Sequence, residues 1–275
     1  MTSRKIAVTG AGGFVGSLLK RRFSGIVPIA RNATLDEIKR ALEGAHVVIN
    51  LAGAPIIKRW SESYKKVLYS SRIETTRRLV EALNSSDVEH FISTSATGIY
   101  PDDMDCDESC PRLADDFLGR LARDWEMEAS KCKKKTTILR FGVVLGNDGG
   151  ALKRMLLPFR LGLGGPIGDG SSVLSWIDIE DLMRIYEFVL ETGIEGVLNA
   201  VSPRPVTNKE FTKALARVLR RPAILPVPPF ILRLLYGEGA TVITGSKRVY
   251  PNRLLEAGFR FKYPDIHSSL QHLLA

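Results

Sequence analysis

Three glycines near the start of the chain could hold a pyrophosphate. Gly10, Gly13 and Gly16 follow a short apolar run, residues 6–8, and lead into a helix-like stretch, residues 17–23. Gly10 can take a backbone conformation closed to other residues, Gly13 lets a phosphate approach the main chain, and Gly16 allows a helix to pack closely on a strand. The free N–H groups at the start of that helix favour an anion. We therefore predict a dinucleotide-binding turn whose contacts are Gly10, Gly13, Phe14, Val15 and Gly16.

An arginine follows the second predicted strand, residues 25–30. At this point in a dinucleotide-binding unit an acidic side chain would bond the 2′-hydroxyl of NAD. Arg31 cannot do so, but its guanidinium suits the extra phosphate of NADP, and it lies roughly twenty residues beyond Gly10. The alternative is a surface arginine at a strand end. We predict that Ala30 and Arg31 contact NADP(H).

A second set of cofactor contacts follows the apolar strand predicted over residues 47–50. The small residues after it let the backbone lie close to a flat ring or a ribose, so Leu51, Ala52 and Gly53 are predicted contacts. A helix is predicted over residues 62–83 from apolar residues at three- and four-residue spacing. Arg72 lies near the edge of that apolar stripe. It could reach a cofactor phosphate, or pack its stem over the core with its head in water.

Alternating strand and helix patterns predict an α/β fold, a Rossmann-type doubly wound parallel sheet with a small, mainly helical C-terminal lobe. Further strands are expected near residues 89–93, 136–141 and 196–200, and capping boxes begin helices at Thr34 and Thr207. We assign residues 1–147 and 176–201 to an NADP-binding domain. Residues 148–175 and 202–275 are assigned to a substrate-side lobe.

Composition narrows the choice of partners. The 275-residue chain carries a formal charge of +9, but its basic residues are spread along it, so we expect no nucleic-acid site, and a basic surface suits anionic small molecules. Cys106, Cys110 and Cys132 offer neither a paired framework nor a metal site and fit a reducing compartment. The apolar stretch 224–236 is too short to span a bilayer. With no room for a leader before the first strand, we expect a cytoplasmic protein without a membrane partner.

In this order the motifs resemble the extended short-chain dehydrogenase/reductase superfamily. Within it, the chain is similar to an atypical branch of NAD(P)-dependent sugar-nucleotide-epimerase-like proteins, formerly called cell-division-inhibitor-like. The glycine turn marks the superfamily, and the middle and late segments are typical of the branch. The resemblance covers almost the whole chain and rests on residues 9–16, 50–53, 71–76, 139–146, 156–165, 176–181 and 248–251.

The resemblance implies a proton relay that this sequence lacks. Active members use a serine or threonine after the fourth strand, together with a tyrosine and a lysine four residues apart on the next helix; the lysine lowers the tyrosine pKa during hydride transfer. Ser95 matches the first position, whereas Leu118 and Ala122 stand nearest the other two. Ser95 and Tyr100 are the catalytic candidates. Ser95 could equally be a loop hydroxyl bonded to backbone groups, and the resemblance favours lining the substrate pocket over catalysis for Tyr100.

Two functions remain open. The first is an NADP-dependent oxidoreductase or epimerase with slow or atypical catalysis, whose small anionic substrate, a nucleotide sugar for example, meets the basic residues Lys153, Arg154 and Arg160. The second is a non-catalytic NADP(H)-binding regulator, favoured by the missing tyrosine–lysine pair. By resemblance we also expect a homodimer formed through the helices near 62–83 and 114–131.

Overall fold

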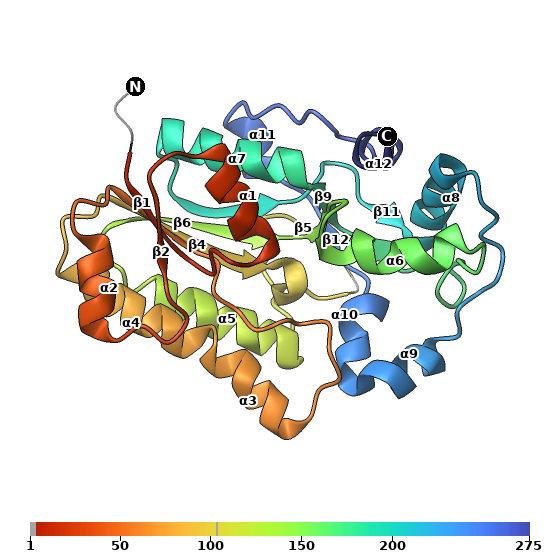
Figure 1. Ribbon diagram of the computed structural model, residues 1–275. Coiled ribbons are helices and arrows are strands. Elements are labelled where there is room, and N and C mark those ends of the chain that lie inside the picture. Colours follow the sequence, from red (N-terminus) through yellow and green to blue (C-terminus); the bar gives the residue numbers. More distant parts are fainter. Residues whose placement is uncertain (1–3, 103) are drawn as a thin grey trace.

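A parallel sheet forms the centre of the molecule in the computed structural model, which describes residues 4–102 and 104–275. Its six strands lie in the order β10-β6-β4-β3-β1-β2, with neighbouring strands parallel, so the predicted Rossmann-type fold is confirmed (Figure 1). The strands are β1 (Ile6–Thr9), β2 (Ile26–Ile29), β3 (Val47–Asn50), β4 (His90–Ala96), β6 (Lys135–Phe141) and β10 (Gly196–Ala200).

Helices cover both faces of this sheet because its strands alternate buried apolar residues between the two sides. Ile6 and Val8 of β1 pack in one apolar cluster with the helices α1 (Phe14–Arg22) and α7 (Ile179–Thr192), whereas Ala7 packs in another. The second cluster joins the sheet to the helices on the opposite face. These are α2 (Leu35–Leu42), α4 (Ile73–Asn84) and α5 (Phe117–Ala129), with α3 (Glu62–Ser70) continuing outward from α4 (Figure 1).

A smaller, mainly helical lobe lies beyond the carboxyl ends of the strands (Figure 1). Its buried residues, including Trp176 and Phe211, form a separate apolar cluster. The lobe and its connections comprise the helices α6 (Gly150–Arg160), α8 (Asn208–Leu219), α9 (Pro229–Tyr236), α10 (Thr241–Thr244), α11 (Asn252–Glu256) and α12 (Ile266–Leu274), the single turns η1 (Thr97–Ile99) and η2 (Gly237–Ala240), and the short strands β5 (Asp105–Cys106), β7 (Val143–Leu145), β8 (Val173–Leu174), β9 (Trp176–Asp178), β11 (Val206–Thr207) and β12 (Arg248–Val249).

The end of the chain crosses the division predicted between the two units. Leu254 of α11 and Phe259 are buried in the same cluster as β1 and α7, and β12 pairs with β5. Residues 248–261 therefore help to cover the sheet, although they lie within the segment 202–275 assigned to the lobe.

The two predicted capping boxes are confirmed, but the long helix predicted over residues 62–83 is not. Both capping boxes are present: the side chains of Thr34 and Thr207 accept hydrogen bonds from the backbone N–H three residues on. The helix predicted over 62–83 is broken into α3 and α4 at Ser71 and Arg72. The Ser71 hydroxyl accepts a hydrogen bond from the Ala54 N–H (3.0 Å), so a tertiary contact to a distant loop fixes the break.

The cysteine prediction is wrong for one pair. Cys106 and Cys110 are joined in a disulfide, with their Cα atoms 5.1 Å apart, and Cys132 is a free thiol. The inference of a reducing compartment from unpaired cysteines therefore does not hold for these two residues.

Candidate functional site

The glycine turn between β1 and α1 leaves its backbone open toward the carboxyl edge of the sheet. Gly10 has φ +67°, and a Cβ there would lie 2.7 Å from the carbonyl oxygen of Leu51. A Cβ on Gly16 would lie 2.5 Å from the Gly10 oxygen. Gly13 caps α1 without any side-chain hydrogen bond, so the first N–H groups of the helix are not claimed by a capping side chain. This is the arrangement that favours an anion at a helix start.

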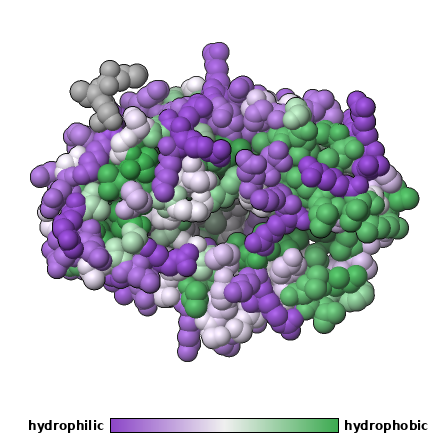
Figure 2. All heavy atoms as spheres, viewed as in Figure 1, coloured by the Kyte–Doolittle hydropathy of each residue, from purple (hydrophilic) through white to green (hydrophobic). Residues whose placement is uncertain are grey.

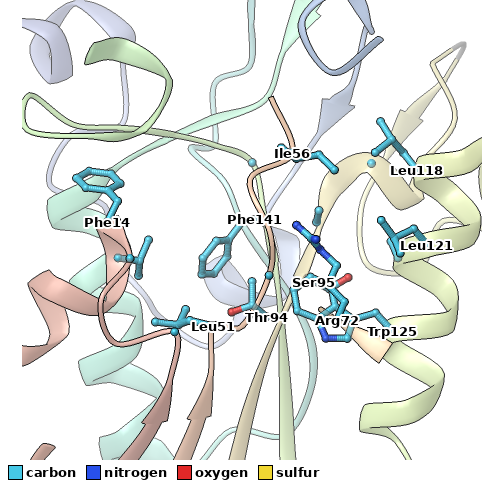
Figure 3. Close-up of a pocket in the computed structure, with 18 of the residues that line it drawn as sticks. Phe14, Leu51, Ile56, Arg72, Thr94, Ser95, Leu118, Leu121, Trp125 and Phe141 are labelled. Carbon is cyan, nitrogen blue, oxygen red and sulfur yellow. The ribbon is translucent and has the colours of Figure 1, made fainter. Parts of the chain in front are cut away.

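Beside the turn lies a cavity of about 360 Å³ (Figure 3). The glycine turn forms one side, the ends of β3, β4 and β6 form the floor, and α5 forms the opposite wall. The ring of Phe14 and the side chains of Leu118 and Leu121 face each other across it (Figure 3). Its lining comprises Gly10, Gly13, Phe14, Val15, Gly16, Leu51, Gly53, Ile56, Arg72, Thr94, Ser95, Ala96, Gly98, Leu118, Leu121, Ala122, Trp125, Phe141 and Gly142.

A smaller cavity of about 120 Å³ continues from the first over the ends of β1, β2 and β3. Gly10, Gly13, Leu51 and Gly53 line both cavities. The smaller one is further lined by Thr9, Ala30, Arg31, Ala52, Ser71 and Thr75, and so contains no carboxylate. Its exposed arginine is the one positive charge among these lining residues.

A buried polar network fixes the backbone where the two cavities meet. Thr9 Oγ1 donates to Asn50 Oδ1 (2.7 Å), and Asn50 Nδ2 donates to Thr76 Oγ1 (2.8 Å). The N–H groups of Leu51 and Ala52 then donate to Thr9 Oγ1 (3.2 Å) and Asn50 Oδ1 (3.3 Å). The short segment after β3 is thus tied to β1, and these side chains position the predicted contacts Leu51 and Ala52.

Arg72 lies in the break between α3 and α4, with its guanidinium against the wall of the larger cavity. It donates to the carbonyl oxygens of Leu68 (3.2 Å) and Ala54 (3.1 Å), and it lies over the Trp125 ring at 5.3 Å. Burial lowers the pKa of this guanidinium to about 10, so it keeps its charge at neutral pH. Its head is therefore held beside the cavity rather than in water, and two of its five N–H donors are directed at these carbonyls.

Ser95 is oriented by a buried ion pair. Its hydroxyl donates to Glu126 Oε1 (2.6 Å), and Glu126 accepts two hydrogen bonds of 2.7 Å from the Arg140 guanidinium. Both ion-pair side chains are nearly covered, 12 % and 10 % exposed. Because the Ser95 proton is committed to Glu126, the lone pairs of this hydroxyl remain to accept a hydrogen bond from a ligand.

Phe14 sits in a socket made by three glycines of the β7–α6 connection. A Cβ on Gly146 or on Gly149 would lie 2.3 Å from this ring, and one on Gly150 would lie 3.1 Å from it. The glycine turn and the start of α6 therefore touch directly, and no larger residue fits at these places without a shift.

Comparison with known proteins identifies the family. Residues 6–200 match the NAD dependent epimerase/dehydratase family, and residues 227–273 match a domain of unknown function. The chain belongs to the NAD-dependent epimerase/dehydratase family. The resemblance drawn from the motifs is thus confirmed.

Relatives and solved structures agree with this assignment. The epimerase family protein SDR39U1 of Mus musculus is 36 % identical, with 98 % of this chain and all of that protein covered, and the chloroplastic homolog of Arabidopsis thaliana is 38 % identical, with 98 % and 86 % covered. The crystal structure of human SDR39U1 isoform 2 with NADPH has a TM-score of 0.90 at 32 % identity, covering 98 % of each chain. A nucleoside-diphosphate sugar epimerase from Corynebacterium glutamicum has a TM-score of 0.79 at 30 % identity, covering 99 % of this chain and 58 % of that one.

Within this epimerase/dehydratase fold, the structure brings all the predicted cofactor contacts together. Every residue predicted to contact the cofactor lines one or both cavities, and so does Ser95.

Tyr100 is the exception and needs a correction. Its side chain is fully buried and lines neither cavity, and its hydroxyl donates to Asn199 Oδ1 (2.9 Å) and accepts a hydrogen bond from Arg140 (2.6 Å). Burial raises the tyrosine pKa despite the neighbouring guanidinium. Tyr100 therefore helps to position Arg140 through this hydrogen bond. Because its side chain does not reach either cavity, its position matches neither catalysis nor lining the pocket.

Several site residues escaped the sequence analysis. Glu126 and Arg140 orient Ser95, while Ile56, Leu121 and Phe141 line the larger cavity. One signal was available, since a charged Arg140 within the apolar strand 136–141 requires a buried partner.

Proposed function

We propose that this chain binds NADPH across the two cavities. The glycine turn leaves backbone space that a Cβ would fill, the smaller cavity carries Arg31 and no carboxylate, and the larger cavity leads to Ser95. In this arrangement the turn would hold the pyrophosphate, Arg31 would meet the 2′-phosphate, and Phe14 and Ser95 would line the space left for the nicotinamide. The human relative crystallised with NADPH supports the same cofactor.

The proposed activity is hydride transfer with slow or atypical proton transfer, as in an oxidoreductase or epimerase. The observation that carries this proposal is Ser95, which lines the larger cavity with its hydroxyl oriented by Glu126. Proton transfer is expected to be slow because the α5 wall of that cavity consists of Leu118, Leu121, Ala122 and Trp125. No tyrosine or lysine stands where the superfamily's relay would be. Bound NADPH would supply a hydride and water the proton, while Ser95 would position a ligand hydroxyl by accepting its hydrogen bond. General acid–base help is typically worth about a hundred- to ten-thousandfold, so turnover without the relay is slow rather than impossible.

For the substrate we propose a small anionic compound of the nucleotide-sugar kind. Arg154 on α6 donates to the carbonyl oxygen of Ile57 (2.9 Å), next to Ile56 in the cavity wall, and therefore brings a positive charge to the cavity's lobe side. The sugar epimerase from Corynebacterium glutamicum is a relative with such a substrate in its name.

A non-catalytic NADPH-binding regulator is the second candidate, and the same apolar wall favours it. One experiment separates the two. The protein is incubated with NADPH and a panel of sugar nucleotides and carbonyl compounds, and absorbance of the reduced nicotinamide is followed. Slow oxidation that falls in Ser95→Ala but persists in Tyr100→Phe supports the enzyme. Tight NADPH binding with neither oxidation of NADPH by any panel member nor epimerisation of a sugar nucleotide supports the regulator, and rapid turnover that survives Ser95→Ala would refute the assigned site.

The homodimer stays a prediction. Val67 and Tyr69 on α3 and Met127 on α5 are exposed apolar side chains on the two helical regions expected to form it.

A further inference from the structure

Exposed apolar side chains gather on the C-terminal lobe. Figure 2 shows a hydrophobic surface at the right of the molecule, over α6 and α9. Thirteen large apolar side chains are exposed among the described residues, and nine of them lie in segments 157–163 and 224–235. We call these nine the lobe patch: Leu157, Leu161, Leu163, Ile224, Leu225, Phe230, Ile231, Leu234 and Leu235.

The two segments lie side by side, so the lobe patch is one surface. The Val227 N–H donates to the Pro166 oxygen (2.8 Å), and the Gly168 N–H donates to the Val227 oxygen (3.0 Å). A Cβ on Gly165 would overlap the Leu225 carbonyl. These backbone contacts hold the turn after α6 against the chain leading into α9.

The helix α9 lacks an apolar face directed at the core. None of its residues is buried, and Phe230 and Leu234, one turn apart, are 68 % and 70 % exposed. Its attachments run through backbone groups: Arg59 donates to the Leu234 oxygen (2.5 Å), and the Trp60 N–H donates to the Tyr236 oxygen (3.3 Å). The helix is thus fixed in place while its side chains face outward.

The two stretches of chain that carry the lobe patch are basic, although the exposed Asp148 and Asp169 flank the first of them. Residues 149–168 contain three basic side chains and residues 211–237 contain five, and neither segment contains an acidic one. The nearest acid along the chain after α9, Glu238, is paired with Lys65 at 2.6 Å. Both stretches carry exposed arginines: Arg160, Arg217, Arg220, Arg221 and Arg233.

We propose that the lobe patch docks on the surface of an anionic lipid bilayer, with Phe230 and Leu234 inserted at the level of the headgroups and the arginines beside lipid phosphates. Exposed apolar side chains together with arginines are the features that hold a protein in this interface. A second copy of the chain is a poorer occupant, because a two-fold interface would set the arginines of one patch against those of the other. No helix in the described part of the chain is long and apolar enough to cross a membrane, so docking here means lying on the surface. The prediction of no membrane partner rested on the lack of a segment long enough to span a bilayer. The lobe patch instead favours binding at the membrane surface.

Vesicle co-sedimentation of the full chain tests the proposal. We expect binding to phosphatidylcholine vesicles containing phosphatidylserine, weaker binding as salt rises, and little binding to pure phosphatidylcholine. Arg221→Gln with Arg233→Gln should weaken binding to the mixed vesicles about fivefold for each arginine removed. Phe230→Ser with Leu234→Ser should weaken it at least about tenfold.

Control variants change exposed residues elsewhere. Leu255→Ser, and Arg21→Gln with Lys39→Gln, should bind the mixed vesicles like the unaltered protein. Equal losses in the control and patch variants, equal binding to both kinds of vesicle, or no binding to either would each overturn the proposal. A dimer seen by sedimentation velocity that dissociates only in the Phe230 and Leu234 variant would overturn it in favour of a second copy, and capture by an acidic protein without vesicle binding would favour a protein partner.

Discussion

Replacing Arg31 with alanine should weaken NADPH binding and leave NADH binding unchanged. Arg31 is the positively charged residue of the smaller cavity, and no acidic side chain lines that cavity to compete for the ribose. A hydrogen bond to a charged group contributes about 1.5–3 kcal/mol. Because Arg31 is exposed, solvent screens the contact, and the lower end applies. We therefore expect NADPH affinity to fall about tenfold.

Fluorescence titration of the two reduced cofactors measures this effect directly. Arg31→Lys should retain part of the NADPH preference, since it keeps the charge but loses the planar pair of donors. The preference should shrink as salt rises, and also as pH falls below about 6, because a phosphate monoester then gains a proton and loses one negative charge. Arg21→Ala, an exposed arginine on the outside of α1, is the control.

Equal affinities for NADPH and NADH in the unaltered protein would refute this reasoning. So would an Arg31→Ala variant that loses affinity for both cofactors alike, because the arginine would then serve the cavity's shape rather than the 2′-phosphate.

Three further predictions concern the turn, the ion pair and a buried histidine. Gly13→Val should abolish NADPH binding in a folded protein because its side chain would block the approach of the phosphate to the main chain, whereas Gly12→Ala, whose Cβ would have nothing within 4 Å, should bind normally in the same titration. Glu126→Gln should lower the free energy of unfolding in urea by about 3–5 kcal/mol because a buried guanidinium loses its charged partner, against less than about 1 kcal/mol for the half-exposed Glu187→Gln. Burial lowers the pKa of His90 to about 4, so between pH 6.5 and 4 the imidazole is protonated in the unfolded chain but not in the folded one. The free energy of unfolding should therefore fall by about 2 kcal/mol from pH 7 to pH 5. If a His90→Gln variant shows the same fall, other groups cause it.

The cofactor side of the site could be predicted because its signals are local. The glycine turn, its flanking strand and helix, and Arg31 at the next strand end lie within the first 31 residues, and each has a sequence signature of its own. The polar side could not be predicted in the same way. Ser95 and Glu126 are 31 residues apart and Arg140 lies on the neighbouring strand, so only the packing of α5 on the sheet brings them together.

The break at Arg72 was hidden for a related reason. Its backbone, at φ −108° and ψ −61°, departs from the helix but stays in the right-handed region, so the apolar stripe of α3 continues into α4. Nothing within residues 62–83 reveals that Ser71 and Arg72 bond the backbone of Ala54.

The Phe14 socket connects the glycine turn, where the cofactor is proposed to bind, with the start of the C-terminal lobe. The ring belongs to the first residue of α1, and the glycines around it lead into α6. A ligand that shifted the start of α1 would therefore also press on the start of α6, and a contact that shifted α6 would act back on the glycine turn. Thermodynamic reciprocity then requires that whatever occupies the lobe changes the affinity for the cofactor by the same factor as the cofactor changes the affinity for that occupant.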